Sequence, residues 1–128
     1  MRLNPDCVRD ILLVAEEHCD NKHMVRFAIK ENTPFEQLLK YTNDEIEYHI
    51  NQCNYAGYFT NVSTMLNRVY LVQDLSPKGH EFLANIRSDT MWNKVKKRAA
   101  QLGLFSLNAI TQIATAVATE TINKHFLN

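Results

Sequence analysis

The sequence predicts a mainly helical α+β fold with a small antiparallel sheet and a helical C-terminal extension. Three glycines and three prolines in 128 residues are far fewer than average usage, which favours long helices over a many-stranded sandwich. Hydrophobic residues make up 45% of the chain and can supply a packed core, and the length allows one domain with an appendage. Apolar residues recur at helical spacing through most of the chain, and β-prone runs occur at three places.

The first helix is predicted to begin at Pro5 and to end near Cys19. Asn4 is a suitable N-cap, and proline at the first helical position loses no hydrogen bond. The apolar residues of this segment recur at helical spacing and form one face: Val8, Ile11, Leu12 and Ala15. Residues 25–29 then alternate between apolar and other side chains, with the period of a half-buried strand.

Two capping signals follow one another in the middle of the chain. Thr33 and Glu36 can form a capping box, which predicts a short helix through Leu38 and Leu39 to about Lys40. Thr42 and Glu45 form a second capping box, which opens a longer helix that ends before Gly57. The residues expected on the core face of this longer helix are Ile46, Ile50 and Cys53, with His49 beside them.

The second half of the chain predicts a hairpin and then helices. Residues 58–62 and 68–72 are β-prone runs, and the polar tip Ser63 to Asn67 between them indicates a turn. A helix is predicted to start at Ser76-Pro77 and either to continue to Gly103 or to break near Ser88-Asp89 on the way, and Ser106 caps a last helix.

This order of elements is that of a winged helix-turn-helix. Residues 35–57 would form the helix-turn-helix, and residues 58–75 would form a small antiparallel β wing. The chain then divides into a winged-helix domain at 1–90 and a C-terminal helical extension at 91–128. We expect the two helices of the extension to form a hairpin that packs on the domain, forms a dimer, or does both.

Several stretches resemble known families. The segment YAGYF at residues 55–59 is similar to the end of the second helix in winged-helix transcription factors. A closer resemblance is carried by MRLNPDCVRDILL at the start, LSPKGHEFLANIR at residues 75–87 and WNKVKK at residues 92–97. These resemble an uncharacterised family of bacterial and prophage proteins that is catalogued as a domain of unknown function. The resemblance implies a phage-associated setting and a winged-helix fold, and it implies no activity.

The fold predicts a DNA-binding protein, with transcriptional regulation as its function and double-stranded DNA as its partner. The second helix of a helix-turn-helix presents its outward side chains to the major groove, where Asn and Gln can bind adenine. The candidate DNA contacts are Tyr48, Asn51, Gln52 and Tyr55 on this helix, Arg68 with the tip Ser63–Asn67 in the wing, and Lys78 at a phosphate.

The charge pattern keeps a second hypothesis open. The whole chain has a formal charge of zero, and residues 42–62 carry three acids and no base. Because DNA affinity depends largely on Lys and Arg at phosphates, this surface is poorly suited to DNA. The alternative is a protein-protein interaction module of phage origin that uses the same fold without DNA binding, with its tyrosines as anchors.

Two further surfaces have a structural and a functional interpretation. The basic cluster Lys94, Lys96, Lys97 and Arg98 is either a solvated helix face, which we favour, or a grip for phosphates. The last helix is nearly uncharged and is apolar on more than one side. It could therefore pack within the chain, form a homodimer, or do both. We expect a homodimer, for which the candidate interface residues are Leu107, Ile110, Ile113, Ala114 and Val117.

The sequence gives no argument for an enzyme, a cofactor or a metal. It contains none of the phosphate-binding, nucleophile-elbow or zinc-protease motifs. His49 and Cys53 are four residues apart on one helix, but two ligands are too few for a metal site. The three cysteines show no paired spacing, which is typical of reduced thiols, and there is no apolar run of membrane-spanning length. We therefore expect a cytoplasmic protein.

Overall fold

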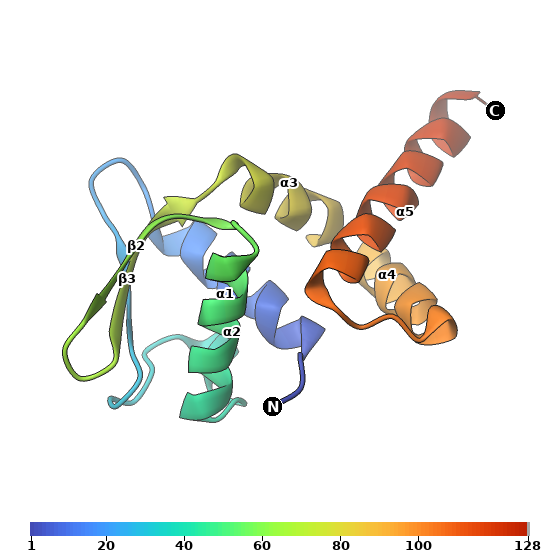
Figure 1. Cartoon of the computed structure of the whole chain (residues 1–128). Helices are drawn as coiled ribbons and strands as arrows, with labels where there is room; N and C mark the ends of the chain where they lie inside the picture. Colours follow the sequence, from blue (N-terminus) through green and yellow to red (C-terminus); the bar gives the residue numbers. More distant parts are fainter. Residues whose placement is uncertain (128) are drawn as a thin grey trace.

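The fold contains five α-helices, one short 3₁₀ helix and three strands within the residues that the structure, a computed structural model, describes (1–127) (Figure 1). Their order is α1 (Pro5–His18), β1 (Val25–Ala28), η1 (Glu36–Leu38), α2 (Asn43–Tyr55), β2 (Phe59–Met65), β3 (Val69–Leu75), α3 (Pro77–Ile86), α4 (Asp89–Leu102) and α5 (Leu107–Leu127). The mixed, mainly helical α+β class is therefore as predicted.

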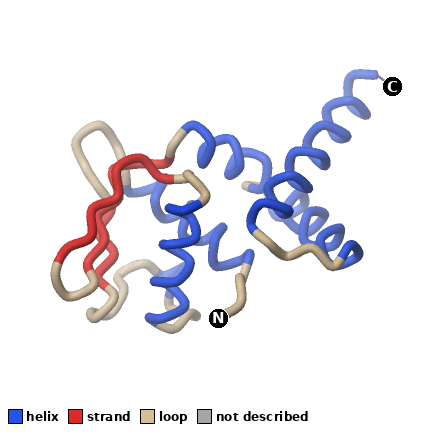
Figure 2. The backbone as a smooth tube through the Cα atoms, viewed as in Figure 1, coloured by secondary structure: helices blue, strands red, loops and turns tan. Residues whose placement is uncertain are grey.

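The three strands form one antiparallel sheet in the order β1-β3-β2. The central strand β3 pairs with β1 from Val25 opposite Val72 to Ala28 opposite Val69. It pairs with β2 through the hairpin, in which Met65 is opposite Val69. Figure 2 shows the sheet at one end of the molecule and α4 with α5 at the other, with α1, α2 and α3 between them. The sheet thus packs against helices and has its strand β2 at an edge.

Side-chain caps begin most of the helices. The side chains of Asn4, Thr42, Ser76 and Ser88 each accept a backbone N–H from the first turn of the following helix. Thr42 and Glu45 form the complete capping box that the sequence predicts. Gly57 follows α2 at φ 79°, a left-handed conformation that a glycine adopts without strain. These local signals explain why the helix limits are predictable from sequence.

Two local predictions are wrong. The hydroxyl of Thr33 accepts the N–H of Phe35 and caps no helix, because the chain forms only the single 3₁₀ turn η1. A short side chain bonded two residues ahead favours a turn over a helix start. The hairpin is also longer than predicted, because Ser63 to Met65 belong to β2 and the turn is confined to residues 66–68.

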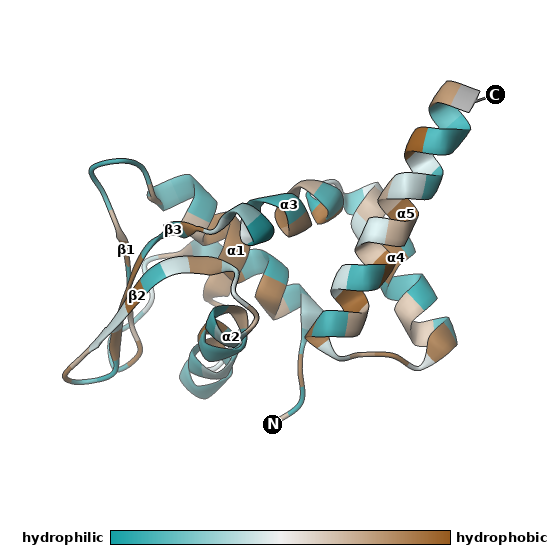
Figure 3. Ribbon diagram, turned by 45° about the horizontal axis from the view of Figure 1, so that its top comes forward, coloured by the Kyte–Doolittle hydropathy of each residue, from teal (hydrophilic) through white to brown (hydrophobic). Residues whose placement is uncertain are grey.

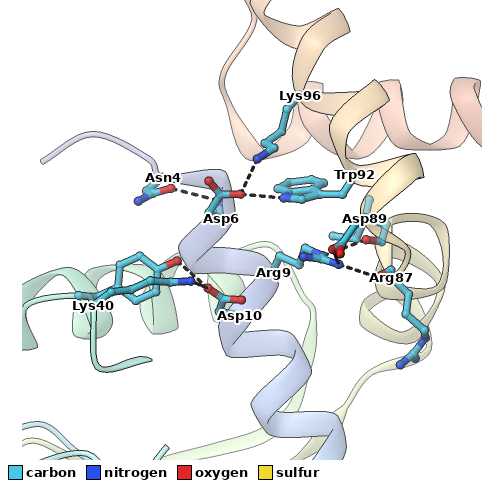
Figure 4. Close-up of polar contacts among 11 residues, drawn as sticks. Asn4, Asp6, Arg9, Asp10, Lys40, Arg87, Asp89, Trp92 and Lys96 are labelled. Carbon is cyan, nitrogen blue, oxygen red and sulfur yellow. Dashed lines mark hydrogen bonds and ion pairs between the residues drawn. The ribbon is translucent and has the colours of Figure 1, made fainter. Parts of the chain in front are cut away.

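The C-terminal helices share one apolar core with the rest of the chain. Trp92, Val95 and Ile110 are buried in the same cluster as residues of α1 and of the sheet. The polar face of α1 adds contacts with α4: Asp6 accepts from Trp92 Nε1 at 2.7 Å and from Lys96 Nζ at 3.0 Å (Figure 4). Arg9 donates to the backbone oxygen of Ile86 and lies 3.0 Å from Asp89 in the same view. Residues 91–127 therefore pack directly on the preceding part.

Candidate functional site

The side chains of Arg68 and Tyr70 link the β2–β3 hairpin to the outward surface of α2. The capping box at Thr42 fixes where α2 begins, and the burial of Ile46, Ile50 and Cys53 fixes which side faces the core. The opposite side is hydrophilic, as the teal colour of α2 in Figure 3 shows. This arrangement places the predicted contact residues of α2 away from the core.

Arg68, at the end of the hairpin turn, forms an ion-pair cluster with α2. Its Nε lies 3.0 Å from Oε1 and 3.1 Å from Oε2 of Glu47, and its Nη2 lies 2.9 Å from Oδ1 of Asp44. The Arg68 hydrogen bonds hold the pKa of Glu47 below its usual range. The guanidinium that the sequence predicts as the wing contact with DNA is therefore bound by two carboxylates of its own chain.

Tyr70 extends this cluster along β3. Its hydroxyl donates to Oε2 of Glu47 at 2.8 Å, and the amide of Asn51 lies 3.5 Å from the same hydroxyl. Burial, followed by the hydrogen bond to Glu47, raises the pKa of Tyr70. Since Tyr70 is nearly buried, this contact anchors the centre of α2 to the sheet and leaves Asn51 half-buried.

The backbone of the hairpin turn is strained at the same place. Asn67 and Arg68 have φ values of 63° and 57°, in the left-handed region that residues other than glycine and asparagine seldom adopt. The carbonyl oxygen of Arg68 accepts the N–H of Ile29 at 3.1 Å, which holds this conformation from the next strand. Strained turns of this kind persist where the surroundings over-determine them, often at binding surfaces.

His49 fastens the buried side of α2 to the start of α1. Its Nε2 accepts the backbone N–H of Asn4 at 2.7 Å, and its Nδ1 donates to the carbonyl oxygen of Glu45 at 2.7 Å. Burial lowers the pKa of His49, which agrees with a neutral ring that has one donor and one acceptor nitrogen. Both ring nitrogens are thereby occupied, and His49 is a positioning residue.

The other predicted contact residues are available on the surface to different degrees. Tyr55 is 76% exposed at the end of α2, and Tyr48 and Gln52 are half-buried. The side chains of these three residues form no hydrogen bond with any described residue. Lys78 is exposed at the start of α3, where its Nζ lies 5.7 Å from the centre of the Tyr58 ring. The surface of α2 thus offers two tyrosines and an amide.

The charge of this surface is acidic. Asp44, Glu45 and Glu47 lie in the first turns of α2, and the helix contains no Lys or Arg. Arg68 neutralises part of this charge and leaves a formal balance of −2. We name this set of residues the acidic aromatic face: Asp44, Glu45, Glu47, Tyr48, Gln52 and Tyr55. Figure 3 shows that the neighbouring hairpin also carries hydrophilic segments.

The candidate dimer residues lie in the interior of the chain. Leu107, Ile110, Ile113, Ala114 and Val117 are all buried, and Ala114 is fully inaccessible. They belong to the core cluster, and α5 packs on α3 and α4. A second copy could reach them only if α5 separated from its own chain, because the intramolecular packing already covers them. The sequence allowed for this packing as one of two possibilities.

The basic cluster on α4 is divided between two sides of the helix. Lys96 binds Asp6 of α1, and Arg98 lies 2.9 Å from Glu120 of α5. Lys94 and Lys97 are exposed and form no ion pair within residues 1–127. Two of the four basic residues are therefore paired with carboxylates, and the four do not form one solvated surface.

Sequence reasoning missed the link from Arg68 and Tyr70 to Glu47. One signal was present, since Asp44 and Glu47 are three residues apart and lie on one side of a helix. Which hairpin residues face that side depends on how the hairpin packs on α2, and no local pattern encodes that. The sequence pattern therefore indicates the acidic side of α2, but it does not indicate which hairpin residues contact that side.

Metal ligation and membrane crossing are two further possibilities for residues 1–127. In that part of the chain, no group of three or more His, Cys, Asp or Glu side chains is placed to hold a metal ion. None of its helices combines the length and the apolar character that are needed to cross a membrane.

Comparison with known proteins places the chain in a family. The family model described as "Hypothetical protein (DUF2513)" matches residues 2–105. The chain belongs to this family. A Haemophilus influenzae protein described as "Uncharacterized protein" is 28% identical over 125 residues, which cover 95% of this chain and 99% of that relative. No solved structure matches the chain.

Proposed function

We propose that the protein is a winged-helix interaction module that binds a protein partner through the acidic aromatic face. The order α1-β1-η1-α2-β2-β3 and the sheet order β1-β3-β2 support the winged-helix assignment. In this assignment α2 is the second helix of the helix-turn-helix, and the hairpin beside it is the wing. The phage-associated setting implied by the family resemblance stays a prediction.

The observation that carries the proposal is the capture of Arg68 by Glu47 and Asp44. DNA binding needs cations that are free to replace the counterions of phosphates, and Arg68, the cation predicted to contact DNA beside α2, is already paired. A phosphate that approached α2 would meet the remaining carboxylates. A protein surface with Lys or Arg would instead be attracted to the same carboxylates.

Tyr48 and Tyr55 supply what such an interface requires besides charge. Tyrosine buries a large ring with little loss of side-chain entropy, and it is enriched among the residues that dominate binding energy. Both rings lie on the half of α2 that faces away from the core, and Tyr55 is largely exposed. The partner is therefore expected to combine basic side chains with a pocket for an aromatic ring.

DNA-binding transcriptional regulation is the second candidate function. Gln52 and Tyr55 favour it, because neither side chain forms a hydrogen bond with a described residue and both lie on the helix that a winged helix would place in the major groove. Lys78 is an exposed cation at the start of α3. In DNA binding, the carboxylates of α2 would repel the phosphates, and the affinity would have to come from few contacts.

A titration against DNA combined with partner capture distinguishes the two functions. Tyr55→Ala and Gln52→Ala change exposed or half-buried side chains, so the fold should be retained. The proposal predicts that Tyr55→Ala removes a specific protein from affinity capture in the source cells, and that Lys22→Ala, an exposed change elsewhere, does not. Sequence-dependent binding of duplex DNA that Gln52→Ala relaxes would contradict the proposal and establish the second candidate.

A further inference from the structure

The groove between α4 and α5 has a charge opposite to that of α2. It measures about 380 Å³ and is lined by residues of both helices. Its lining consists of polar and charged side chains and one valine: Lys94, Lys97, Arg98, Gln101, Val117, Glu120, Thr121 and Lys124. Four of these are cations and one is an anion, which gives a formal balance of +3.

Three of the four cations of this groove are available for a ligand. Arg98 holds Glu120 at 2.9 Å, so the single carboxylate of the groove is neutralised by its neighbour. Lys94, Lys97 and Lys124 have no carboxylate within 4.0 Å among residues 1–127. Three unpaired ammonium groups thus surround one depression.

The remaining basic residues show that this concentration is unusual for the chain. Seven of the 14 Lys and Arg residues form ion pairs in the part of the chain that the structure describes: Arg9, Arg26, Lys40, Arg68, Arg87, Lys96 and Arg98. Of the seven that form none, Arg2, Lys22, Lys30 and Lys78 lie on other segments. The groove therefore gathers nearly half of the unpaired cations of a neutral protein.

The helix geometry aligns these side chains along the groove. Lys94, Lys97 and Gln101 project from one side of α4, because they are three and four residues apart. Lys94 and Gln101 are separated by about 10 Å along the helix, at about 1.5 Å per residue. Lys124 reaches the same groove from α5. The result is an elongated row of donors, suited to an extended polyanion.

We propose that the groove between α4 and α5 binds the phosphodiester backbone of a nucleic acid. Lysine ammonium groups and the Gln101 amide are donors that phosphate oxygens accept. The lining has no aromatic ring, so bases have no stacking platform and single strands gain no additional affinity from stacking. Contacts to phosphates carry no sequence information, and binding at this groove is therefore independent of sequence.

The salt dependence follows from the number of free lysines. Three phosphate contacts give a slope of about −2.7 in log K against log salt for duplex DNA. Affinity then falls about 20-fold between 50 mM and 150 mM salt. The test is fluorescence anisotropy of the full chain with a labelled 20-bp duplex, with a single strand of the same sequence, and with a poly-glutamate peptide.

Two matched triple variants locate the binding. The groove variant carries Lys94→Gln, Lys97→Gln and Lys124→Gln, and the control carries the same change at Lys22, Lys30 and Lys78. The proposal predicts at least a tenfold loss of duplex affinity at 50 mM salt for the groove variant, and less than a threefold loss for the control. Circular dichroism melting shows that each variant is folded.

The outcomes separate the sources of binding. Equal affinity for duplexes of different sequence, with the predicted salt slope, supports the proposal. A preference for the single strand contradicts it, because a lining without aromatic rings gives single strands no gain from stacking. Loss of affinity in the control variant overturns it, because Lys78 belongs to the winged-helix side. It is also overturned if poly-glutamate binds as tightly as DNA, or if no duplex binding occurs at 50 mM salt.

Discussion

His49 gives the sharpest stability prediction, because it joins α2 to the start of α1 from a fully buried position. Replacement by leucine keeps a similar volume but removes the acceptor for the N–H of Asn4. A buried donor without a partner costs about 1–3 kcal/mol. The carbonyl oxygen of Glu45, the other partner, keeps its helical hydrogen bond and adds little to the cost.

The expected loss for His49→Leu is therefore about 2 kcal/mol at pH 7.5, which corresponds to a lower melting temperature by roughly 8 °C. The pH dependence tests the cause. Because the pKa of His49 is lowered in the folded state, the unfolded chain takes up the proton first as the pH falls. The wild-type stability that depends on His49 is present above pH 6.5, the ordinary value for histidine, and is lost below it.

The assay is urea unfolding followed by circular dichroism at pH 7.5, 6.0 and 5.0, for the wild type and for His49→Leu. The difference between the two proteins should be largest at pH 7.5 and should shrink as the pH falls. Taking this difference removes the contribution of the exposed histidines, which both proteins share. A gap that is constant or that widens in acid would refute the assigned role of the neutral ring.

Other stability predictions rest on local geometry. Gly79→Ala should destabilise the fold by about 2 kcal/mol although alanine is the better helix former, because the added Cβ would lie 2.2 Å from the backbone oxygen of Tyr58. An unchanged urea midpoint would disprove this packing. Thr42→Ala should cost about 1 kcal/mol through loss of the capping box, whereas Thr42→Ser should cost much less; equal midpoints for the two variants would contradict the cap. Val95→Ala should cost about 2 kcal/mol in the same assay if α4 shares the core, and a separate early transition for α4 and α5 would show that it does not.

The sequence predicts the helices and strands well where the deciding interactions are local. Asn4, Thr42 and Ser76 cap the helices that their patterns indicate, and Gly57 and Gly103 follow helix ends. Each of these signals involves groups within about four residues, which the sequence lists in order. Thr33 and Glu36 show where such local patterns fail. The same capping-box pattern is followed there only by the single 3₁₀ turn η1, and no α-helix begins.

The candidate site was less predictable because its decisive contacts are long-range. The sequence indicates the outward side of α2, including the exposed Tyr55. It does not indicate that Arg68 binds Glu47 across 21 positions, or that Asn51 lies beside Tyr70. Both depend on the packing angle between a hairpin and a helix. The charge available to a ligand therefore differs from the charge counted along the chain.

The same distinction applies to the last helix and to the basic cluster. The apolar composition of α5 indicates that this helix must be buried on more than one side. In the structure, α3 and α4 pack against it. Among the four basic residues of the cluster, Lys96 and Arg98 are neutralised by partners far away in the sequence, Asp6 and Glu120. Which lysines stay available can be known only after folding.

Photo-cross-linking from position 55 tests the central claim most directly. A photoreactive phenylalanine analogue replaces the exposed Tyr55 on α2 in the source cells, and the same analogue at Glu81, exposed on α3, is the matched control. The proposed function predicts an adduct with one protein at position 55 that is resistant to nuclease and absent from position 81. An adduct at position 55 that nuclease removes, or the same protein adduct from both positions, would contradict it.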